Sequence, residues 1–201
     1  MKKQFILLAV LFFLSLNIIA QTDTIEGAFW RPKPRNYEVK HAIEVESLFP
    51  MFFTGGYHFA VGYRYKKFRL RVSVINGGNY NAETAGVNNN SDNFKRYYQT
   101  SPGVFFGYNL WKNLELYTYV ESHTFSIEQK STGIKHDLKS KDFGAGLSYQ
   151  FFIGRYVYIQ PGLHLYLRAS NSSDFNGIIY HIPNADISPV IRFGVRLWGK
   201  Y

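Results

Sequence analysis

The feature that most constrains this chain is an alternation of apolar and polar residues with a period of two. It is clearest in the stretch 187–201, which reads ISPVIRFGVRLWGKY. One set of alternate positions is apolar, while the other carries Arg192, Arg196 and Trp198. Such a period places alternate side chains on opposite faces of a β-strand. The apolar face then needs a cover, which is either a second protein layer or lipid.

The first twenty residues predict a signal peptide, with basic Lys2 and Lys3, an apolar run over 5–16 and the small residue Ala20. A membrane anchor is the alternative, but the run is short and residues 21–26 are polar and acidic. Loss of the two lysines lowers the formal charge from +9 to +7, because residues 1–20 contain no acid. For an exported basic chain, anionic lipid or lipopolysaccharide is a more suitable partner than nucleic acid.

The amino-acid composition narrows the fold class further. The chain has 16 Tyr, 18 Phe and 17 Gly, a combination that favours β-structure with interfacial aromatic rings. It has no cysteine, which excludes disulfide bonds, a lipoprotein anchor and thiolate metal sites.

Eight segments from residue 38 onward show the alternation. They are 38–49, 56–65, 68–75, 103–110, 114–127, 143–152, 156–168 and 187–201. No apolar-face position in them is Asp, Glu, Lys or Arg, although charged residues form 18% of the chain. A lipid-facing surface excludes these residues, since an Arg or Lys at the bilayer midplane costs about 2–4 kcal/mol. Pro102, Pro161 and Pro189 lie in or beside these segments, and each predicts a bulge or a strand end.

The links between the segments alternate in length. Short links occur at 66–67, 111–113 and 154–155, and long polar links occur at 78–96, 128–142 and 169–186. This alternation is typical of a membrane barrel with both termini on the short-turn, periplasmic side. Residues 21–37 contain Pro32 and Pro34, which predict an irregular periplasmic arm.

Aromatic residues gather near both ends of the predicted strands. Near the short links lie Tyr63, Tyr65, Phe68, Tyr108, Trp111, Tyr156, Trp198 and Tyr201. Near the long links lie Phe49, Phe52, Phe53, Tyr57, Tyr97 and Tyr98. Two such belts agree with the preference of aromatic rings for membrane interfaces.

The signal peptide, the eight alternating segments, the two kinds of link and the final aromatic residue together resemble small outer-membrane β-barrels of the OmpA and OmpX type. The resemblance covers nearly the whole mature chain. It implies an all-β, eight-stranded antiparallel up-and-down transmembrane barrel over 38–201. It also implies that the last strand carries the signal read by the barrel assembly machinery. The matching positions are Phe193, Val195, Leu197 and Tyr201, with Gly199 in place of the usual apolar residue.

The predicted inward faces carry four acids and five arginines. They are Glu44, Glu46, Glu115, Glu121, Arg64, Arg69, Arg71, Arg192 and Arg196. An eight-stranded barrel is just wide enough for its side chains to fill it. Buried charges need partners, and planar guanidinium groups suit carboxylates, so we predict ion pairs that close the lumen. A narrow ion path or a binding site is the alternative.

Three histidines also face inward near the long links, namely His58, His123 and His164. Pairing of His58 with Glu46 and of His123 with Glu121 makes these four residues candidate catalytic groups. They would serve an outer-leaflet enzyme that modifies acyl chains of lipid A or phospholipid. Ser126 argues against this, because it is three residues from His123 and faces the opposite way. The histidines have no zinc spacing, and we predict neither a metal nor another cofactor.

The long links carry few functional signals. Lys130, Lys135, Lys139 and Lys141 lie in link 128–142, where they are expected to contact lipopolysaccharide phosphate or to be ordinary solvated side chains. The run 88–90 (NNN) predicts a flexible tip. We therefore predict a monomeric integral outer-membrane protein with a structural or surface-interaction role, and the acyl-modifying enzyme is the alternative.

Overall fold

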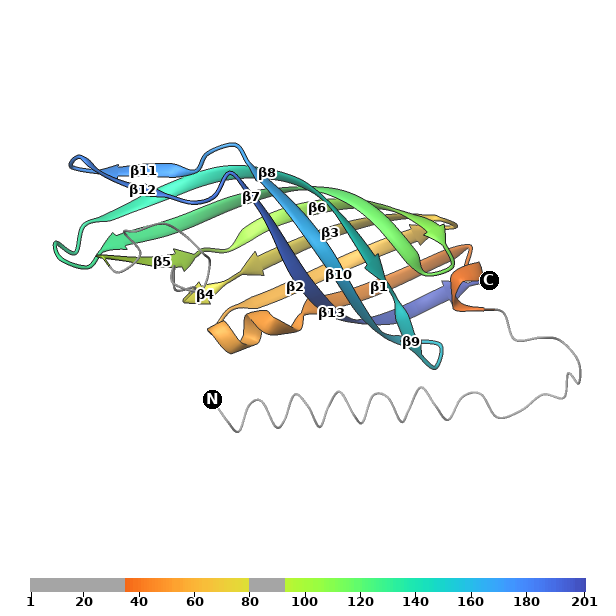
Figure 1. Ribbon diagram of the computed structural model, residues 1–201. Coiled ribbons are helices and arrows are strands. Elements are labelled where there is room, and N and C mark those ends of the chain that lie inside the picture. The colour runs from red at the N-terminus through yellow and green to blue at the C-terminus, as the bar shows by residue number, and fades with distance from the viewer. Residues whose placement is uncertain (1–34, 80–92) are drawn as a thin grey trace, which may run out of the picture. The chain divides into compact units, whose positions relative to one another are not determined.

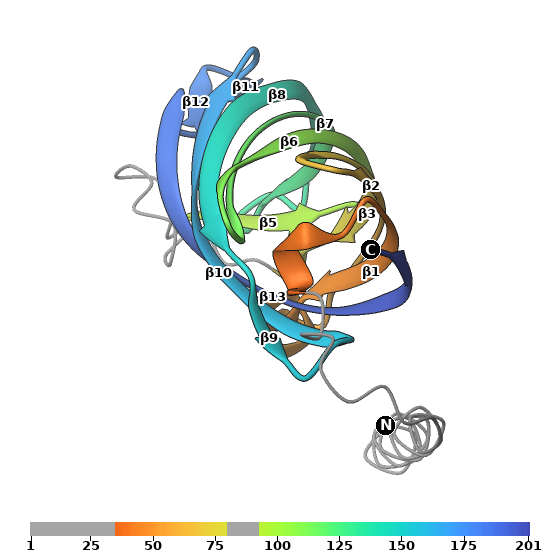
Figure 2. The same ribbon diagram turned by 90° about the vertical axis from the view of Figure 1, so that its right-hand side faces the viewer.

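Eight antiparallel strands in the described part of the chain close into a barrel (Figures 1 and 2). The computed structural model describes residues 35–79 and 93–201. The barrel strands are β1 (His41–Leu48), β2 (Tyr57–Tyr65), β3 (Phe68–Asn76), β6 (Ser101–Trp111), β7 (Leu114–Gln129), β8 (Lys135–Tyr149), β10 (Val157–Arg168) and β13 (Ala185–Lys200). Each pairs with the next in this order, and β13 pairs with β1. The predicted up-and-down barrel of eight strands is confirmed.

Short 3-10 helices precede and follow the first strand. They are η2 (Asn36–Glu38) and η3 (Phe49–Thr54). Within residues 35–79 and 93–201, no helix is long and apolar enough to cross a membrane. The expected signal peptide at 1–20, the arm up to residue 34 and the tip at 88–90 lie outside the described residues.

The predicted inward and outward faces agree with the burial of the strands. Along β2 and β3, exposed and buried residues alternate without exception up to Ile75, as a two-residue period requires. The outward residues are apolar and the inward ones include Arg64, Arg69 and Arg71, each at most 1% exposed. Val39 departs from the prediction, because it precedes β1 and is buried.

Trp198 was predicted to face inward, and this is wrong because of a bulge in β13. The register between β1 and β13 shifts between the pairs Ile43–Trp198 and Glu44–Arg196, so that Leu197 is the extra residue. An extra residue changes the phase of the alternation. Leu197 and Trp198 therefore both lie on the outer surface, 62% and 48% exposed.

The three short turns have the backbone geometry of tight hairpins. Lys66, Lys112 and Gly154 have φ angles of 52°, 48° and 71°, in the left-handed region. This conformation matches the twist of the strands that each turn connects. The short links were therefore predicted correctly.

Each strand proline lies where one neighbouring ladder stops. Pro102 pairs with Val74 of β3, but the ladder to β7 begins only at Gly103. Pro189 pairs with Leu163 of β10, beyond the end of the ladder to β1. Pro161 pairs with Ile191 of β13, opposite the break between β8 and β9 (Phe151–Ile153). A proline has no N–H to donate, so it is tolerated at such edges.

The three long links contain more strand than the sequence indicated. β7 and β8 continue as a hairpin to the pair Glu128–Lys135, so most of link 128–142 is strand. Link 169–186 contains the hairpin of β11 (Ser172–Phe175) and β12 (Ile178–His181). Its turn is Asn176–Gly177, with φ angles of 55° and 89°. Link 78–96 begins with β4 (Gly78–Asn79) and ends within β5 (Phe94–Tyr98).

These additional strands enclose an apolar cluster at the long-loop end, which we call the cap. Its buried members are Phe94, Phe125, Ile127, Leu138, Phe175, Tyr180 and Ile182. Burial raises the pKa of the Tyr180 hydroxyl above its ordinary value, and the nearby charge of Arg96 opposes this shift. Phe125 and Ile127 follow His123 on the same face of β7, so the cap continues the lumen-facing side outward.

Candidate functional site in the barrel lumen

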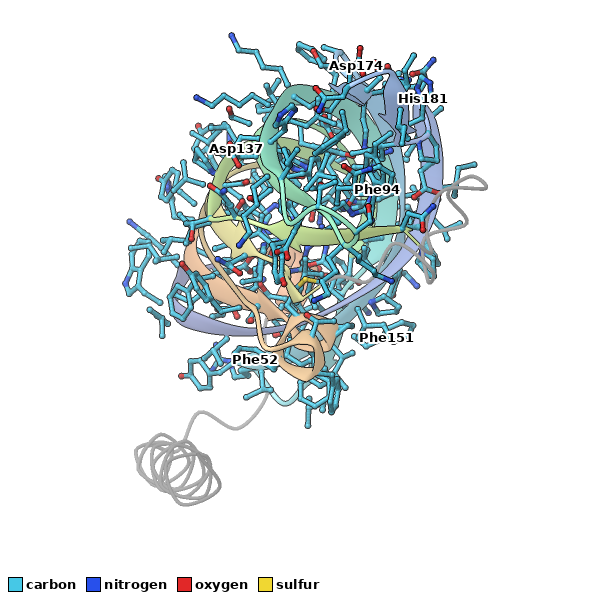
Figure 3. The ribbon with its side chains drawn as sticks, turned by 90° about the vertical axis from the view of Figure 1, so that its left-hand side faces the viewer. Phe52, Phe94, Asp137, Phe151, Asp174 and His181 are labelled. Carbon is cyan, nitrogen blue, oxygen red and sulfur yellow. The ribbon has the colours of Figure 1, made fainter. Side chains whose placement is uncertain are left out.

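The charged residues of the central network in the lumen come from five of the barrel strands described above. β1 supplies Glu44 and Glu46, β2 supplies Arg64, β3 supplies Arg69 and Arg71, β7 supplies Glu115, and β13 supplies Arg192 and Arg196. Each is at most 3% exposed. Their inward direction follows from the alternation along each strand. Figure 3 looks into the barrel from the long-loop end, with Phe94 inside the ring of strands and Phe151 outside it.

Arg69 lies at the centre of the network. Its Nε is 2.8 Å from Oε2 of Glu44, its Nη2 is 2.8 Å from Oε2 of Glu46, and its Nη1 is 3.1 Å from Oε2 of Glu115. Tyr158 also donates its hydroxyl hydrogen to Glu46 and accepts a hydrogen bond from Arg69. One guanidinium group therefore joins carboxylates from β1 and β7.

Arg71 completes a closed ring of four ion pairs. Its Nη1 is 2.9 Å from Oε1 of Glu46, and its Nη2 is 2.8 Å from Oε1 of Glu115. Both glutamates therefore bridge Arg69 and Arg71. A planar guanidinium group suits such simultaneous contacts, which lysine would not reproduce. Buried charges of opposite sign are stable only when they are paired and hydrogen-bonded in this way.

Arg196 and Arg64 contact the network toward the short-turn end. Nη2 of Arg196 is 2.7 Å from Oε1 of Glu44, and Nε of Arg64 is 3.8 Å from the same oxygen. Arg64 also donates to Oε1 of Gln150. On the long-loop side, Arg192 lies 3.5 Å from Glu46 and donates to Nε2 of His164.

The five arginines exceed the three glutamates of this network, so neutral groups complete the coordination. Gln160 accepts a hydrogen bond from Arg69, and the Asn36 carbonyl oxygen accepts one from Arg196. Aromatic ring faces contribute as well, since Cζ of Arg192 lies 5.3 Å from the Tyr117 ring centre. The sequence did not identify Gln150 and Gln160 as members of this network, because an uncharged inward residue, unlike a buried charge, does not require a partner of opposite sign.

Glu121 belongs to a separate cluster nearer the long loops. Oε2 of Glu121 is 3.1 Å from Nε2 of His123, whose Nδ1 is 3.3 Å from Oδ2 of Asp142. The Tyr98 hydroxyl lies 2.8 Å from Nε2 of the same ring, so its predicted place in the outer aromatic belt is wrong. Arg168 lies 3.4 Å from Asp142. The alternation of Leu138, Ser140 and Asp142 in β8 is the signal that could have found this cluster.

The structure brings together one of the two candidate catalytic pairs and not the other. His123 and Glu121 are brought together, as described above. His58 instead accepts a hydrogen bond at Nδ1 from the Leu48 N–H, and Glu46 is bound by the arginines. Ser126 lies on the opposite side of β7 from His123. Ser140 faces His123 across the sheet, but its hydroxyl donates to Asp142 at 2.6 Å.

The three inward histidines do not form a common site. His164 is bound by Arg192 and Tyr166, and the partners of His58 and His123 are different. Across the described ranges, no group of three or more His, Asp or Glu side chains could hold a metal ion.

The outer surface of the barrel is the apolar counterpart of this charged interior. Its most exposed midstrand residues include Phe59, Val61, Leu70, Val72, Val104, Phe106, Leu116, Leu147, Leu163 and Ile191, which are 44% to 56% exposed. An apolar exterior around a charged interior reverses the arrangement of a water-soluble protein. The fold and the lumen define the class of small eight-stranded barrels with a filled interior.

The solved structures that resemble this chain include two small β-barrels. One is the N-terminal β-barrel domain of OprF from Pseudomonas aeruginosa, with 14% identity, a TM-score of 0.42, and coverage of 79% of this chain and 99% of that one. The other is Neisserial surface protein A (NspA), with 14% identity, a TM-score of 0.39, and coverage of 78% and 96%. No protein-family model and no curated protein sequence matches the chain.

Proposed function

We propose that this chain is an integral outer-membrane β-barrel protein whose lumen is closed by ion pairs. It would act as a structural or surface-interaction protein of the cell envelope and not as a channel. The observation that carries this proposal is the ring formed by Glu46, Glu115, Arg69 and Arg71.

The membrane location is supported by the apolar exterior. Val61 and Val72 pair directly at the middle of β2 and β3 and are 45% and 53% exposed. In water such a continuous apolar surface would promote aggregation, whereas lipid covers it favourably. Purified protein should require detergent or lipid and should migrate faster in gels before heating than after heating. Free solubility as a monomer without detergent would contradict the membrane location.

The closed lumen is supported by the size of the barrel and by the contacts inside it. Eight strands enclose a space that side chains can fill. Arg69 and Arg71 contact glutamates from β1 and β7, and all four side chains are at most 1% exposed. An ion could pass this level only if these pairs separated, which costs several kcal/mol per buried ion.

A conductance measurement tests the closed lumen. Protein refolded into planar bilayers should give no discrete current steps, while a porin in the same bilayer gives them and serves as the positive control. Regular steps from the folded protein would replace this proposal with the narrow ion path that the sequence left open.

A surface role is supported by the long-loop end of β8. Lys139 and Lys141 are exposed on the same face of β8 as Phe143, which is 48% exposed on the apolar band. This order supports contact between the ammonium groups and the phosphates of lipopolysaccharide, which lie just beyond the acyl region of the outer leaflet. Lys130 and Lys135 are exposed farther along the hairpin. The variant Lys139→Gln, Lys141→Gln should retain less lipopolysaccharide than the parent after detergent purification.

Assembly is proposed to depend on the last strand. Phe193, Val195 and Leu197 all lie on the outward side of β13, and the Tyr201 hydroxyl accepts a hydrogen bond from Arg196. Recognition by the assembly machinery would use this exposed side before the barrel closes. The Tyr201→Ala variant should reduce the amount of heat-modifiable protein in membranes, whereas Tyr97→Ala, at the other end, should not.

The acyl-modifying enzyme gains no support from the lumen. Both ring nitrogens of His123 contact acids or Tyr98, and the Ser140 hydroxyl donates to Asp142. A serine nucleophile needs a base that accepts its proton. Mass spectrometry of lipid A with and without the protein should show the same acylation. A change that His123→Ala abolishes would restore the enzyme hypothesis.

A further inference from the structure

Three lysines meet at one point of the short-turn end. The backbone N–H of Lys40 donates to the carbonyl oxygen of Lys200, and the N–H of Lys66 donates to the carbonyl oxygen of Lys40, each at 2.7 Å. The ends of β13, β1 and β2 thus place these lysines side by side, and all three are exposed. Figure 2 shows this end of the barrel, with the C-terminus beside β1. Lys200 pairs with His41, the residue next to Lys40. The three like charges therefore lie close together and repel each other, so the cluster favours an anionic partner.

The described residues supply little opposing charge at this point. Glu38 is the nearby exposed acid in the described residues, and its carboxylate accepts a hydrogen bond from the Arg35 N–H at 3.0 Å. Glu44 is fully buried and is bound by arginines. The lysine ammonium groups are therefore available to a ligand.

A layer of aromatic rings lies directly below the lysines. His41 contacts two tyrosines of β2, with its Nδ1 2.7 Å from the Tyr63 hydroxyl and its ring 5.1 Å from that of Tyr65. The Lys66 ammonium lies 5.2 Å from the centre of the Tyr65 ring. Amphipathic rings of this kind occupy the headgroup level of a membrane.

The combination of a cation and an aromatic ring occurs at all three short turns. Nζ of Lys67 lies 5.8 Å from the Tyr108 ring centre, and Nζ of Lys112 lies 4.3 Å from that of Trp111. Cζ of Arg155 lies 5.1 Å from the Tyr201 ring centre. We call the six basic residues the basic rim; they are Lys40, Lys66, Lys67, Lys112, Arg155 and Lys200.

We infer that the basic rim binds the phosphate groups of anionic phospholipids, with Lys40, Lys66 and Lys200 as the principal site. The ammonium groups bind the phosphate as point charges, and the rings below them contact the glycerol region and the first methylenes. Attraction to an anionic membrane increases with each lysine near its surface. The inference rests on the proposed membrane location and adds a lipid preference to it.

Trp198 provides a probe beside this site. It is 48% exposed on the outer surface, opposite Ile43 and two residues before Lys200. The variant Trp30→Phe, Trp111→Phe leaves Trp198 as the one remaining tryptophan, since the chain has three. Its fluorescence is measured in bilayers that contain brominated phosphatidylglycerol or brominated phosphatidylcholine in equal proportion. Quenching by each lipid reports how often that lipid occupies the position next to Trp198.

We expect brominated phosphatidylglycerol to quench Trp198 at least about threefold more than brominated phosphatidylcholine does. This quotient is the quenching ratio. The triple variant Lys40→Gln, Lys66→Gln, Lys200→Gln should lower this ratio to about one, and so should high salt with the unsubstituted lysines, because salt screens exposed charges. The matched control Lys95→Gln, Lys139→Gln, Lys141→Gln removes three exposed lysines from the other end and should preserve the preference.

The outcomes separate the two proposals. A ratio of one before any lysine is changed overturns the phospholipid site but leaves the membrane location standing. Absence of quenching by both lipids overturns the membrane location itself. If the control variant loses the preference for phosphatidylglycerol to the same extent, the preference depends on net charge, and the local site is overturned. If the triple variant fails to fold, the salt dependence still decides, because a preference that high salt leaves unchanged contradicts binding through ammonium groups.

Discussion

Arg69 and Glu46 are ion-paired across the lumen, with Nη2 and Oε2 2.8 Å apart, although their strands β3 and β1 are not hydrogen-bonded to each other. β2 separates these strands on one side, and β6 separates β3 from β7, which carries the other partner Glu115. The guanidinium group of Arg69 thus links three non-adjacent strands from the inside. Backbone ladders define the order of strands, and this contact adds stabilisation across the lumen.

The first prediction concerns the removal of this central charge. Arg69→Met leaves the buried carboxylates of Glu44 and Glu46 with fewer partners, so the free energy of unfolding should fall by about 3–5 kcal/mol. Urea unfolding in lipid or detergent measures the change. Lys135→Met is the control, because its ion pair with Glu128 is at the surface and the lysine side chain is 61% exposed. That change should stay within about 1 kcal/mol, and equal losses in the two variants would contradict the prediction.

The barrel could be predicted because lipid imposes a rule on every strand that faces it. Charges are excluded from alternate positions, so strands such as β2 and β3 show the alternation over nearly their whole length. The same rule gave the correct inward direction of Glu115 and Glu121 in β7. Which arginine each glutamate contacts was not predictable, since the pairs depend on strand stagger and on side-chain reach across the lumen.

The prediction from the sequence failed in the strand segments where charged residues are no longer excluded from the outward face. In the outer part of β8, exposed Asp137, Lys139 and Lys141 alternate with buried Leu138 and Ser140, so the period persists without an apolar face. We therefore mistook this strand for a solvated loop. The Asn176–Gly177 turn was a detectable signal for the β11–β12 hairpin that we did not use. The bulge at Leu197 has no signal of its own, because one inserted residue shifts the phase only locally.

The second prediction concerns the contact between Gly194 and Tyr158, which face each other on β13 and β10. A Cβ at position 194 would overlap the Tyr158 ring, whose hydroxyl contacts Glu46 and Arg69. Gly194→Ala should therefore lower the free energy of unfolding by about 1–3 kcal/mol through overpacking. The double variant with Tyr158→Ala should lose less than the sum of the two single changes. Additive losses in urea unfolding would show that the contact is unimportant.

The third prediction distinguishes lipid from water at the outer surface. Val61 lies at the middle of β2 and is 45% exposed. In a membrane, Val61→Arg should lower the free energy of unfolding by about 2–4 kcal/mol, because the charge enters hydrocarbon. On a surface covered by water the same change would cost about 0.5 kcal/mol or less. Ser131→Arg, in the exposed turn after β7, is the control that should remain near neutral. Unfolding must be measured in lipid vesicles, because detergent adapts to the added charge.

The last prediction concerns the independence of the cap from the barrel. Phe175 is 2% exposed, and its ring lies 5.0 Å from that of Phe94 and 4.4 Å from that of His136. Phe175→Ala removes the largest apolar contact of β11, and a buried Phe→Ala change costs about 3–5 kcal/mol locally. Because the hairpin pairs β11 only with β12, this loss should open the hairpin without separating the barrel strands.

Limited proteolysis tests this independence, with cleavage expected in segment 169–184 at a rate at least about tenfold above that of the parent. The heat-modifiable migration of the barrel should remain, as should its resistance to urea. The matched control is Phe151→Ala, whose side chain is 56% exposed on the outer surface at the other end of the barrel. It should leave cleavage in the hairpin unchanged. Simultaneous loss of barrel resistance in Phe175→Ala would show that the cap and the barrel unfold as one unit, because a local opening leaves the ion pairs of Arg69 and Glu46 in place.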